Sequence, residues 1–337
     1  MLNARLFALA IAICCWASTQ AAGQAPAPNG NAKAAAWKAS RLADGHPDLQ
    51  GYWTNNTATP LQRPAGAGEF LTADEVKARA AGRGGQAAQN RNNPFPSLFG
   101  IAAGAAEARF VMRRTSIITD PPDGKIPPMT PEAQKKFAAD QEHHKLHPHD
   151  GPEDMGALER CITWITSGPP MLPTFYNNNY QIVQTHDHVA IATEMVHDVR
   201  IIPVDGRPHG DIRQWMGDSR GHYEGDTLVV ETINFNGKRG WFERSGTEPG
   251  GEKRPDQKMK VMERFTRTAP DVLLYQFTVD DPGIYTKPWS GEIEMQALKS
   301  PLIEYACHEG NQGMELMLGG ARADEKAAAE AARKKSQ

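Results

Sequence analysis

Residues 259–283, MKVMERFTRTAPDVLLYQFTVDDPG, decide the fold class of this 337-residue chain. Apolar and polar side chains alternate across residues 259–267. Beyond them the odd-numbered positions 273–279 carry Leu, Tyr, Phe and Val, whereas the even-numbered positions 274–280 carry Leu, Gln, Thr and Asp. A period of two indicates β-strands, because successive side chains of a strand point to opposite faces. Ala269-Pro270-Asp271 separates the two runs, so the stretch predicts two strands joined by a tight turn.

The same alternation recurs in other segments of the second half of the chain. They are residues 180–185, 189–195, 199–204, 227–233, 293–297 and 303–307, and turns rich in Asp, Gly and Pro lie between them. Short strands at this spacing predict a mainly β domain, an antiparallel meander that is closed as a barrel or strongly curled. Gly51-Tyr52-Trp53 resembles the G-x-W pattern of lipocalin-type barrels, in which the Trp plugs one barrel end. We therefore expect a lipocalin-like general plan.

A few short helices are expected outside the strands. Thr72 and Glu75 have the spacing of a capping box, and Thr130 followed by Pro131 predicts the start of a helix over residues 131–144. Several prolines occur in residues 113–128, which predicts an irregular segment that wraps the core. The expected organisation is a signal peptide (1–22), a flexible leader (23–45), a wrapping segment with short helices (46–155), a β-barrel-like core (156–320) and an exposed helical tail (321–337).

The N-terminus has the organisation of a secretory signal peptide. Arg5 precedes the apolar run LFALAIAICCWA at 6–17, and small residues at 21–23 offer a cleavage site. The run is shorter than the roughly 20 residues that a membrane span requires. A lipoprotein is the alternative because of Cys14 and Cys15, although Ile13 is larger than the residue that normally precedes a lipidated cysteine. We expect a periplasmic or secreted protein with no transmembrane segment in its mature chain.

Removal of the signal peptide leaves two cysteines, Cys161 and Cys307. An even number in an exported protein favours one disulfide bond. Such a bond would join the beginning of the predicted core to its end. Two separate buried thiols are the alternative.

The composition argues against several classes of partner. The net charge is −3, and no concentrated basic face of the kind that nucleic-acid binding requires is evident. Gly and Pro number 31 and 25, which indicates many loops but not general disorder. Rossmann, P-loop and haem-attachment motifs are absent from the sequence. The expected partner is a small-molecule ligand or substrate, with no cofactor, and the oligomeric state stays open.

Several longer motifs resemble those of a family of exported bacterial proteins of unknown function. They are PDLQGYWT (47–54), RRTSIITDPPDGKIPP (113–128), GPPMLP (168–173), HDVRIIPVDGRPH (197–209), WMGDSRGHYEGDTLVVET (215–232), ERFTR (263–267) and YACHEGN (305–311). The resemblance covers nearly the whole mature chain, apart from the loop at 82–108. It implies export, one domain and a β-rich fold, and it implies no mechanism.

The densest run of ionisable side chains is HDVRIIPVDGRPHGDIRQWMGDSRGHYEGD, residues 197–226. His197 and His209 are candidate acid–base residues, because histidine exchanges protons near neutral pH and a neighbouring carboxylate, Asp198 or Asp205, fixes its tautomer. Arg207 and Arg213 carry planar donor groups suited to a carboxylate, a phosphate or a developing oxyanion. The alternative is a structural network in which Asp218, Glu224 and Asp226 neutralise these arginines.

A second candidate cluster follows from the expected disulfide. Arg160 precedes Cys161, and His308 and Glu309 follow Cys307, so the crosslink would bring the three together near the same rim. A disulfide-bonded Cys307 would be neither nucleophile nor metal ligand.

Two further motifs carry less weight. Zinc could be bound by His197, His209 and His308 together with a carboxylate, since these are common zinc ligands. No tight ligand spacing supports a zinc site, however, and we expect no metal. Residues 217–221 fit G-x-S-x-G around Ser219. That motif works between a strand and a helix, whereas a turn and a strand are expected here, so we interpret the match as chance.

Two classes of function remain. The first is an exported small-molecule enzyme of the hydrolase, lyase or isomerase type, with His/Asp acid–base chemistry and arginine substrate clamps at a barrel mouth. The second is a non-catalytic, lipocalin-like periplasmic ligand-binding protein. The density of ionisable groups in 197–226 favours the enzyme.

Overall fold

The computed structural model describes residues 37–80, 109–157, 159–174, 176–238 and 257–336. The signal peptide and most of the leader expected from the sequence lie outside these residues, as does the loop at 82–108. Residues 37–337 belong to one compact unit.

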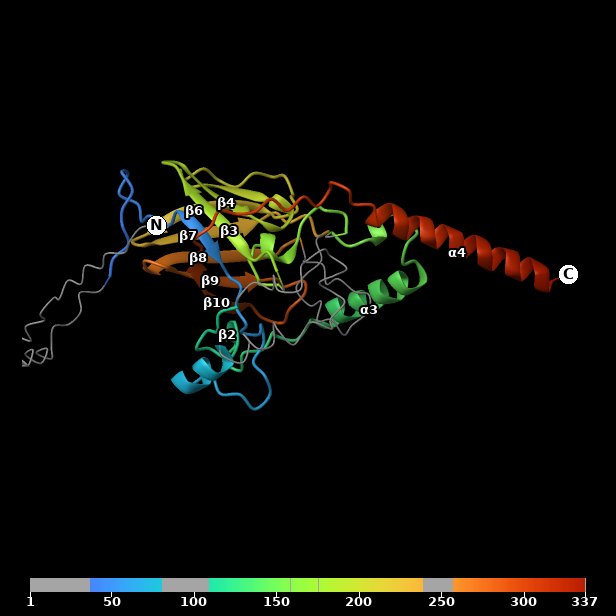
Figure 1. Ribbon diagram of the computed structural model, residues 1–337, viewed down its shortest axis with the longest axis horizontal. Helices are drawn as coiled ribbons and strands as arrows, with labels where there is room; N and C mark the ends of the chain where they lie inside the picture. Colours follow the sequence, from blue (N-terminus) through green and yellow to red (C-terminus); the bar gives the residue numbers. More distant parts are fainter. Residues whose placement is uncertain (1–36, 81–108, 158, 175, 239–256, 337) are drawn as a thin grey trace, which may run out of the picture. The chain divides into compact units, whose positions relative to one another are not determined.

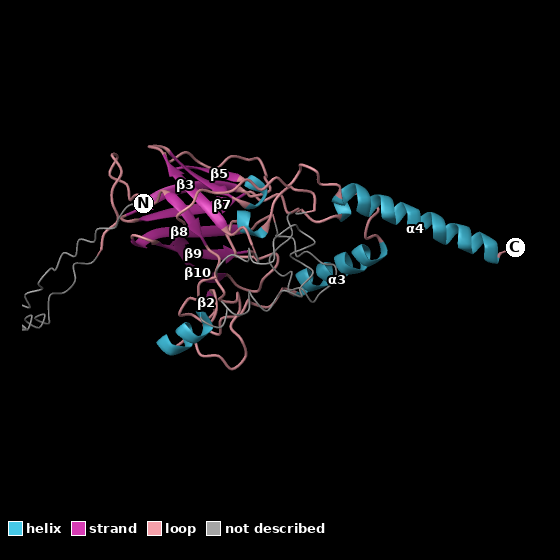
Figure 2. Cartoon of the chain, in the orientation of Figure 1, coloured by secondary structure: helices cyan, strands magenta, loops and turns pink. Residues whose placement is uncertain are grey.

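The described residues form ten strands in one antiparallel sheet, which curls into a nearly closed barrel (Figures 1 and 2). The order of neighbours is β5-β4-β3-β1-β10-β9-β8-β7-β6, and β2 also pairs with β10. The strands are β1 (Gly51–Thr54), β2 (Ile118–Asp120), β3 (Asn179–Gln184), β4 (His188–Thr193), β5 (Val199–Pro203), β6 (Asp218–Glu224), β7 (Thr227–Ile233), β8 (Lys260–Ala269), β9 (Val272–Asp280) and β10 (Trp289–Ala297).

The two ends of this strand order, β5 and β6, meet along a seam. A Cβ atom added to Gly221 of β6 would lie 3.0 Å from Val204 Cγ1 and 3.1 Å from Ile202 Cγ2. A glycine therefore lets the two strands approach closely enough for their side chains to close the barrel. The strand pairing found in the described residues does not join β5 to β6, so packing rather than a hydrogen-bond ladder holds this seam.

The mainly β, barrel-like class expected from the sequence is confirmed, with three differences in detail. β1 and β2 come from the segment before residue 156, and β1 lies between β3 and β10 in the sheet. β6 was not expected as a strand. Residues 303–307 form no strand, because their alternation has no neighbouring strand with which to pair.

Trp53 of β1 belongs to the buried core. Its side chain is 1% exposed, its Nε1 donates to the Leu49 carbonyl at 3.1 Å, and the guanidinium of Arg267 lies over its ring at 5.3 Å. Arg267 also donates to the carbonyl of Asp48 at 3.2 Å. Trp53 is therefore a buried part of the core, and the guanidinium of Arg267, near the end of β8, covers its ring.

The interior of the barrel is filled by side chains from alternate positions of the strands. β9 illustrates the rule, because Leu273, Tyr275, Phe277 and Val279 are all buried and the positions between them are half-buried. Tyr275 and Phe265 lie 5.0 Å apart between ring centroids, within the range of favourable aromatic pairs. This packing is the main source of hydrophobic stabilisation in the fold.

Three helices lie outside the sheet in the described part of the chain. Residues 73–80 are helical behind the expected capping box, in which Thr72 N donates to Glu75 at 2.7 Å and Glu75 N donates to Thr72 Oγ1 at 3.2 Å. α3 (Pro131–Leu146) is capped by Thr130, whose Oγ1 accepts from Ala133 N. α4 (Gly313–Lys335) contains no buried residue and begins before the expected tail at 321. None of the described helices is long and apolar enough to cross a bilayer.

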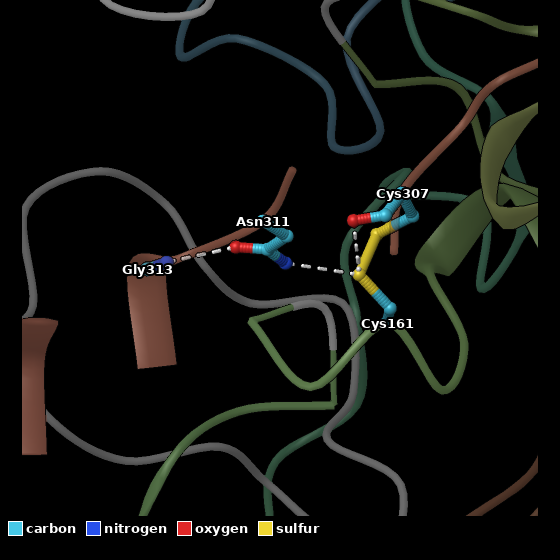
Figure 3. The surroundings of a disulfide bond; sticks show 4 residues. All are labelled: Cys161, Cys307, Asn311 and Gly313. Atoms are coloured by element: carbon cyan, nitrogen blue, oxygen red, sulfur yellow. Dashed lines mark hydrogen bonds between the residues drawn. A yellow bond between two sulfur atoms is a disulfide. The ribbon is translucent and has the colours of Figure 1, made fainter. Parts of the chain in front are cut away.

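The disulfide between Cys161 and Cys307 is present, as expected, and joins residues 146 positions apart in the sequence (Figure 3). Beside it, Asn311 Nδ2 lies 3.2 Å from Cys161 Sγ, and Asn311 Oδ1 accepts from Gly313 N at 3.0 Å. The crosslink therefore holds the segment that follows β10, directly before α4, against the segment that precedes β3. Its presence is compatible with an exported protein.

Candidate functional site

His209 lies between two carboxylates on the outer face of β6 and β7. Its Nδ1 lies 3.2 Å from Asp218 Oδ2, and its Nε2 lies 3.3 Å from Glu231 Oε1. Ser219 points to the barrel interior, where its Oγ contacts Thr232 Oγ1 at 2.8 Å, so strand alternation places the neighbouring Asp218 and Glu231 outside. The histidine comes from the loop 204–217, which connects β5 to β6.

Asp218 organises the whole end of that loop. One carboxylate oxygen accepts from Gly210 N at 2.8 Å, and the other pairs with Arg220. Arg220 Nε also donates to the carbonyl of Pro208 at 2.9 Å. Only 11% of the Asp218 side chain is exposed, so its carboxylate is held in place before any ligand arrives.

The three groups differ in accessibility. The His209 side chain is 18% exposed and that of Glu231 is 40% exposed, and Lys260 Nζ lies 3.7 Å from Glu231 Oε2. Asp218 thus acts as a fixed partner on the Nδ1 side, while Glu231 is an exposed and displaceable partner on the Nε2 side. A carboxylate accepts hydrogen bonds, so each of these two can accept one from the neighbouring ring nitrogen when that nitrogen carries the proton.

The two carboxylates lie on opposite sides of the imidazole, which is the wrong arrangement for a shared metal ion. Among the described residues, no group of three or more His, Cys, Asp or Glu side chains is placed to hold one. The chemistry that this arrangement can supply is proton transfer, because histidine exchanges a proton near neutral pH and a carboxylate orients it.

The structure gives the expected catalytic carboxylates different roles. Asp205 pairs with Arg207 across their own turn, with Arg207 Nε 2.8 Å from Asp205 Oδ2, so it is Asp218 that orients His209. Asp198 lies directly before β5, where its carbonyl accepts from Thr193 N at 2.8 Å. The side chain of His197 lies outside the described residues.

The pKa of Asp205 is lowered from its ordinary value of 3.8 to about 2, first by the hydrogen bond from the Arg207 side chain and then by the Arg207 backbone N–H. We expect its carboxyl carbon to titrate with a midpoint of about 2 in an NMR titration of the folded protein. The pair contributes stability above the unfolded-state pKa, and that contribution is lost as the pH falls through the folded value. Arg207→Gln should return the midpoint toward 3.8. An identical midpoint in both proteins would contradict the assignment.

The other expected substrate-binding residues are dispersed. Arg213 donates to the carbonyls of Gln257 at 2.7 Å and Phe235 at 3.3 Å, which tethers its loop and uses donors that a substrate would need. Arg160 lies 3.9 Å from Glu153. His308 and Glu309 are exposed and follow the disulfide-bonded Cys307 in the sequence, and their proximity to Arg160 stays a prediction.

Ser219 does not have the setting of a nucleophile. It lies near the start of β6, is 6% exposed and hydrogen-bonds to Thr232. No helix follows it, since β6 runs directly into β7 through the turn at Gly225. The G-x-S-x-G match therefore lacks the strand–turn–helix geometry that the chemistry requires.

Sequence reasoning missed a charged network inside the barrel. Arg200 of β5 donates to both oxygens of Glu263 of β8 at 2.7 and 3.1 Å, and Tyr275 OH donates to Glu263 at 2.8 Å. Burial alone would lower the pKa of Arg200, but Glu263 outweighs it and holds that pKa above its ordinary value. Burial and the Glu263 charge both raise the pKa of Tyr275, so its hydroxyl remains a proton donor.

This interior network continues toward the segment 164–172. Met171 N donates to Tyr275 OH at 2.9 Å, and Asn55 Nδ2 donates to Met171 O and to Tyr180 OH, each at 3.0 Å. Several buried polar atoms of this region have no hydrogen-bond partner among the described residues: Asn55 Oδ1, Thr166 Oγ1, Ser167 Oγ, Thr193 Oγ1 and Arg200 Nε. Unsatisfied groups at this density are typical of a place that holds ordered water or a small polar molecule.

Glu194, directly after β4, is a further buried charged residue. It is 7% exposed, and its carboxylate accepts from Asn177 Nδ2 and Asn179 Nδ2, each at 2.9 Å. Val196 follows with a φ of 62°, a conformation that is strained for a β-branched residue and that concentrates at functional sites. The Asn-Asn-Asn run at 177–179 was the signal in the sequence that could have indicated this polar turn.

The comparisons with known proteins do not add to this description. No protein-family model, no curated protein and no solved structure matches the chain. The function is therefore argued from the side chains themselves.

Proposed function

We propose that this protein is an exported enzyme that acts on a small molecule by acid–base chemistry, with His209 as the proton-transferring residue. The observation that supports the proposal is the placement of the His209 imidazole between an anchored carboxylate, Asp218, and an exposed one, Glu231. The reaction class is hydrolysis, elimination or isomerisation, because each needs a proton donor or acceptor and no redox group.

Each residue has a distinct role in this proposal. Asp218 fixes the ring through Nδ1 and compensates the charge of the imidazolium, as carboxylate partners of catalytic histidines do. A substrate that displaces Glu231 would meet Nε2, where the proton is transferred. Arg207 lies on the same loop, half-exposed and paired with Asp205, and its guanidinium would bind an anionic group of the substrate.

His209→Gln tests the proposal, because the amide retains a hydrogen-bonding group but cannot exchange a proton near neutral pH. We expect it to lower kcat by about 10²–10⁴-fold on whichever model compound the wild type turns over, in a panel of nitrophenyl esters, lactones and nitrophenyl glycosides. Asp218→Asn should also lower kcat, because the amide no longer supplies the negative charge that compensates the imidazolium.

His222→Gln is the matched control for this experiment. His222 is also on β6, is exposed and lies 3.2 Å from a carboxylate of Glu224, yet it is not anchored between two elements. Its replacement should leave kcat unchanged. Turnover by His209→Gln equal to that of the wild type, in protein with normal circular dichroism and an intact disulfide, would refute the mechanism.

The second candidate is a non-catalytic ligand-binding protein of the periplasm. The unpaired polar atoms inside the barrel, among them Thr166 Oγ1 and Thr193 Oγ1, favour it, since a bound polar molecule would satisfy them. Native mass spectrometry of protein purified from the periplasm distinguishes the two: a stoichiometric small molecule that is recovered unaltered supports binding, whereas conversion of an added compound supports catalysis.

A further inference from the structure

An open groove of about 370 Å³ lies on the outer side of β10. The antiparallel bridge between Phe70 and Arg114, together with the hydrogen bond from Leu71 N to Arg113 O at 2.7 Å, holds two chain segments next to one another along the groove. The residues that line it are Phe70, Met112, Arg113, Arg114, Glu292 and Glu294. Its volume is within the range of pockets that bind small molecules, roughly 300–1,000 Å³.

Two of the charged residues in the groove neutralise each other. Arg114 pairs with Glu292 and donates to Glu69 at 2.8 Å. Its guanidinium also lies 4.8 Å from the centroid of the Phe70 ring, within the distance of a cation–π interaction. These contacts fix the wall of the groove and hold the aromatic ring against it.

The other two charged residues have no such partner. Arg113 and Glu294 are exposed, and in the described part of the chain neither side chain takes part in an ion pair or hydrogen bond. The groove therefore presents one free guanidinium and one free carboxylate to solvent. Both retain their full capacity to bind a charged ligand group.

Two apolar side chains also line the groove. Phe70 is 52% exposed, whereas Met112 is 3% exposed and belongs to the core. A ligand with an apolar side group would bury the exposed face of Phe70 and gain about 25 cal/mol for each Å² removed from water.

We propose that this groove binds a small zwitterion with an apolar side group, of the class of α-amino acids and dipeptides. The carboxylate of the ligand pairs with Arg113, its ammonium group pairs with Glu294, and its side group lies on Phe70 and Met112. A ligand with one charge would leave the other residue without a counterion, so the groove selects for both charges together.

Isothermal titration calorimetry tests the proposal with L-phenylalanine and the dipeptide Phe-Ala as probes. We expect at least one to bind about threefold or more tightly than both 2-phenylethylamine and 3-phenylpropanoate, since an exposed ion pair contributes up to about 1 kcal/mol. Arg113→Gln and Glu294→Gln should each weaken the binding of the zwitterion about threefold. Both residues are exposed, so neither change should impair folding.

Arg333→Gln and Glu304→Gln are the matched controls, because both side chains are exposed and neither lines the groove. They should leave the Kd unchanged. The proposal is overturned if neither zwitterion binds at millimolar concentration, if the groove variants bind like the wild type, or if 3-phenylpropanoate binds as tightly as the zwitterions. Since none of these residues belongs to the His209 cluster, the result is independent of the proposed enzyme.

Discussion

Glu263→Gln is expected to lower the free energy of unfolding by about 3–5 kcal/mol, because breaking a buried ion pair leaves the remaining charge without compensation. Arg200 would then keep its charge at 4% residue exposure with no carboxylate in reach of its two donated hydrogen bonds. Tyr275 would lose its anionic acceptor at the same time. Urea unfolding followed by circular dichroism measures the change, with the m-value as the check that the transition stays two-state.

Two further variants separate the loss of the pair from the loss of a charge. Arg200→Met/Glu263→Leu replaces both partners by apolar side chains, and should be closer to the wild type than Glu263→Gln, since no buried charge is left over. Glu224→Gln breaks an ion pair to Arg264 of similar length, 2.9 Å, that is exposed, and should hardly change the unfolding midpoint. A single variant no worse than the double one would show that the pair is not a coupled unit.

Removal of the disulfide is expected to have an effect of similar size. In the chain-entropy model, opening a loop that joins residues 146 positions apart lowers the free energy of unfolding by about 5 kcal/mol, through the greater freedom of the unfolded chain. The loop includes all strands from β3 to β10, so the crosslink restricts nearly the whole sheet in the unfolded state. Cys161→Ser/Cys307→Ser avoids the new thiols that a single replacement would leave.

Thermal unfolding with and without dithiothreitol measures this contribution. The double variant should unfold at the lower temperature under both conditions, and the wild type should approach it only when reduced. An unchanged transition of the wild type upon full reduction, established by mass spectrometry, would contradict the prediction. The same experiment tests the link to export, because a protein that depends on this bond must fold where disulfides form.

The strands were predictable wherever burial alternates cleanly. β9 and the first part of β8 carry apolar side chains at every inward position except Glu263, so a period of two was visible in the sequence. β6 was missed because its inward positions include Ser219 and Gly221, which carry no apolar signal, and a Cβ at Gly221 would be in tight contact with side chains of the β5 end of the barrel. β1 was missed as a member of the sheet because its partners, β3 and β10, are far away in the sequence.

The candidate site was predictable in its residue types but not in its pairing. His209 was identified as an acid–base residue, yet its partners Asp218 and Glu231 are brought to it by the register of β6 against β7, which a sequence does not specify. Glu263 lies at an inward position of an otherwise apolar face, and that mismatch was the available indication of a buried charge. Its counterion could not be named, because Arg200 is on a strand that reaches it only across the closed barrel.

The seam between β5 and β6 has a mechanical consequence. Elsewhere in the barrel, separating two neighbouring strands means breaking a row of backbone hydrogen bonds, whereas at the seam side-chain contacts resist, among them those around Gly221 and the buried ion pair from Arg200 of β5 to Glu263 of β8. The loop 204–217 crosses from one side of this seam to the other and carries His209, while Asp218 and Glu231 belong to the β6 side alone. A small widening of the seam would therefore shift the imidazole relative to its carboxylates, so the stiffness of the candidate site depends on the side-chain packing across the seam.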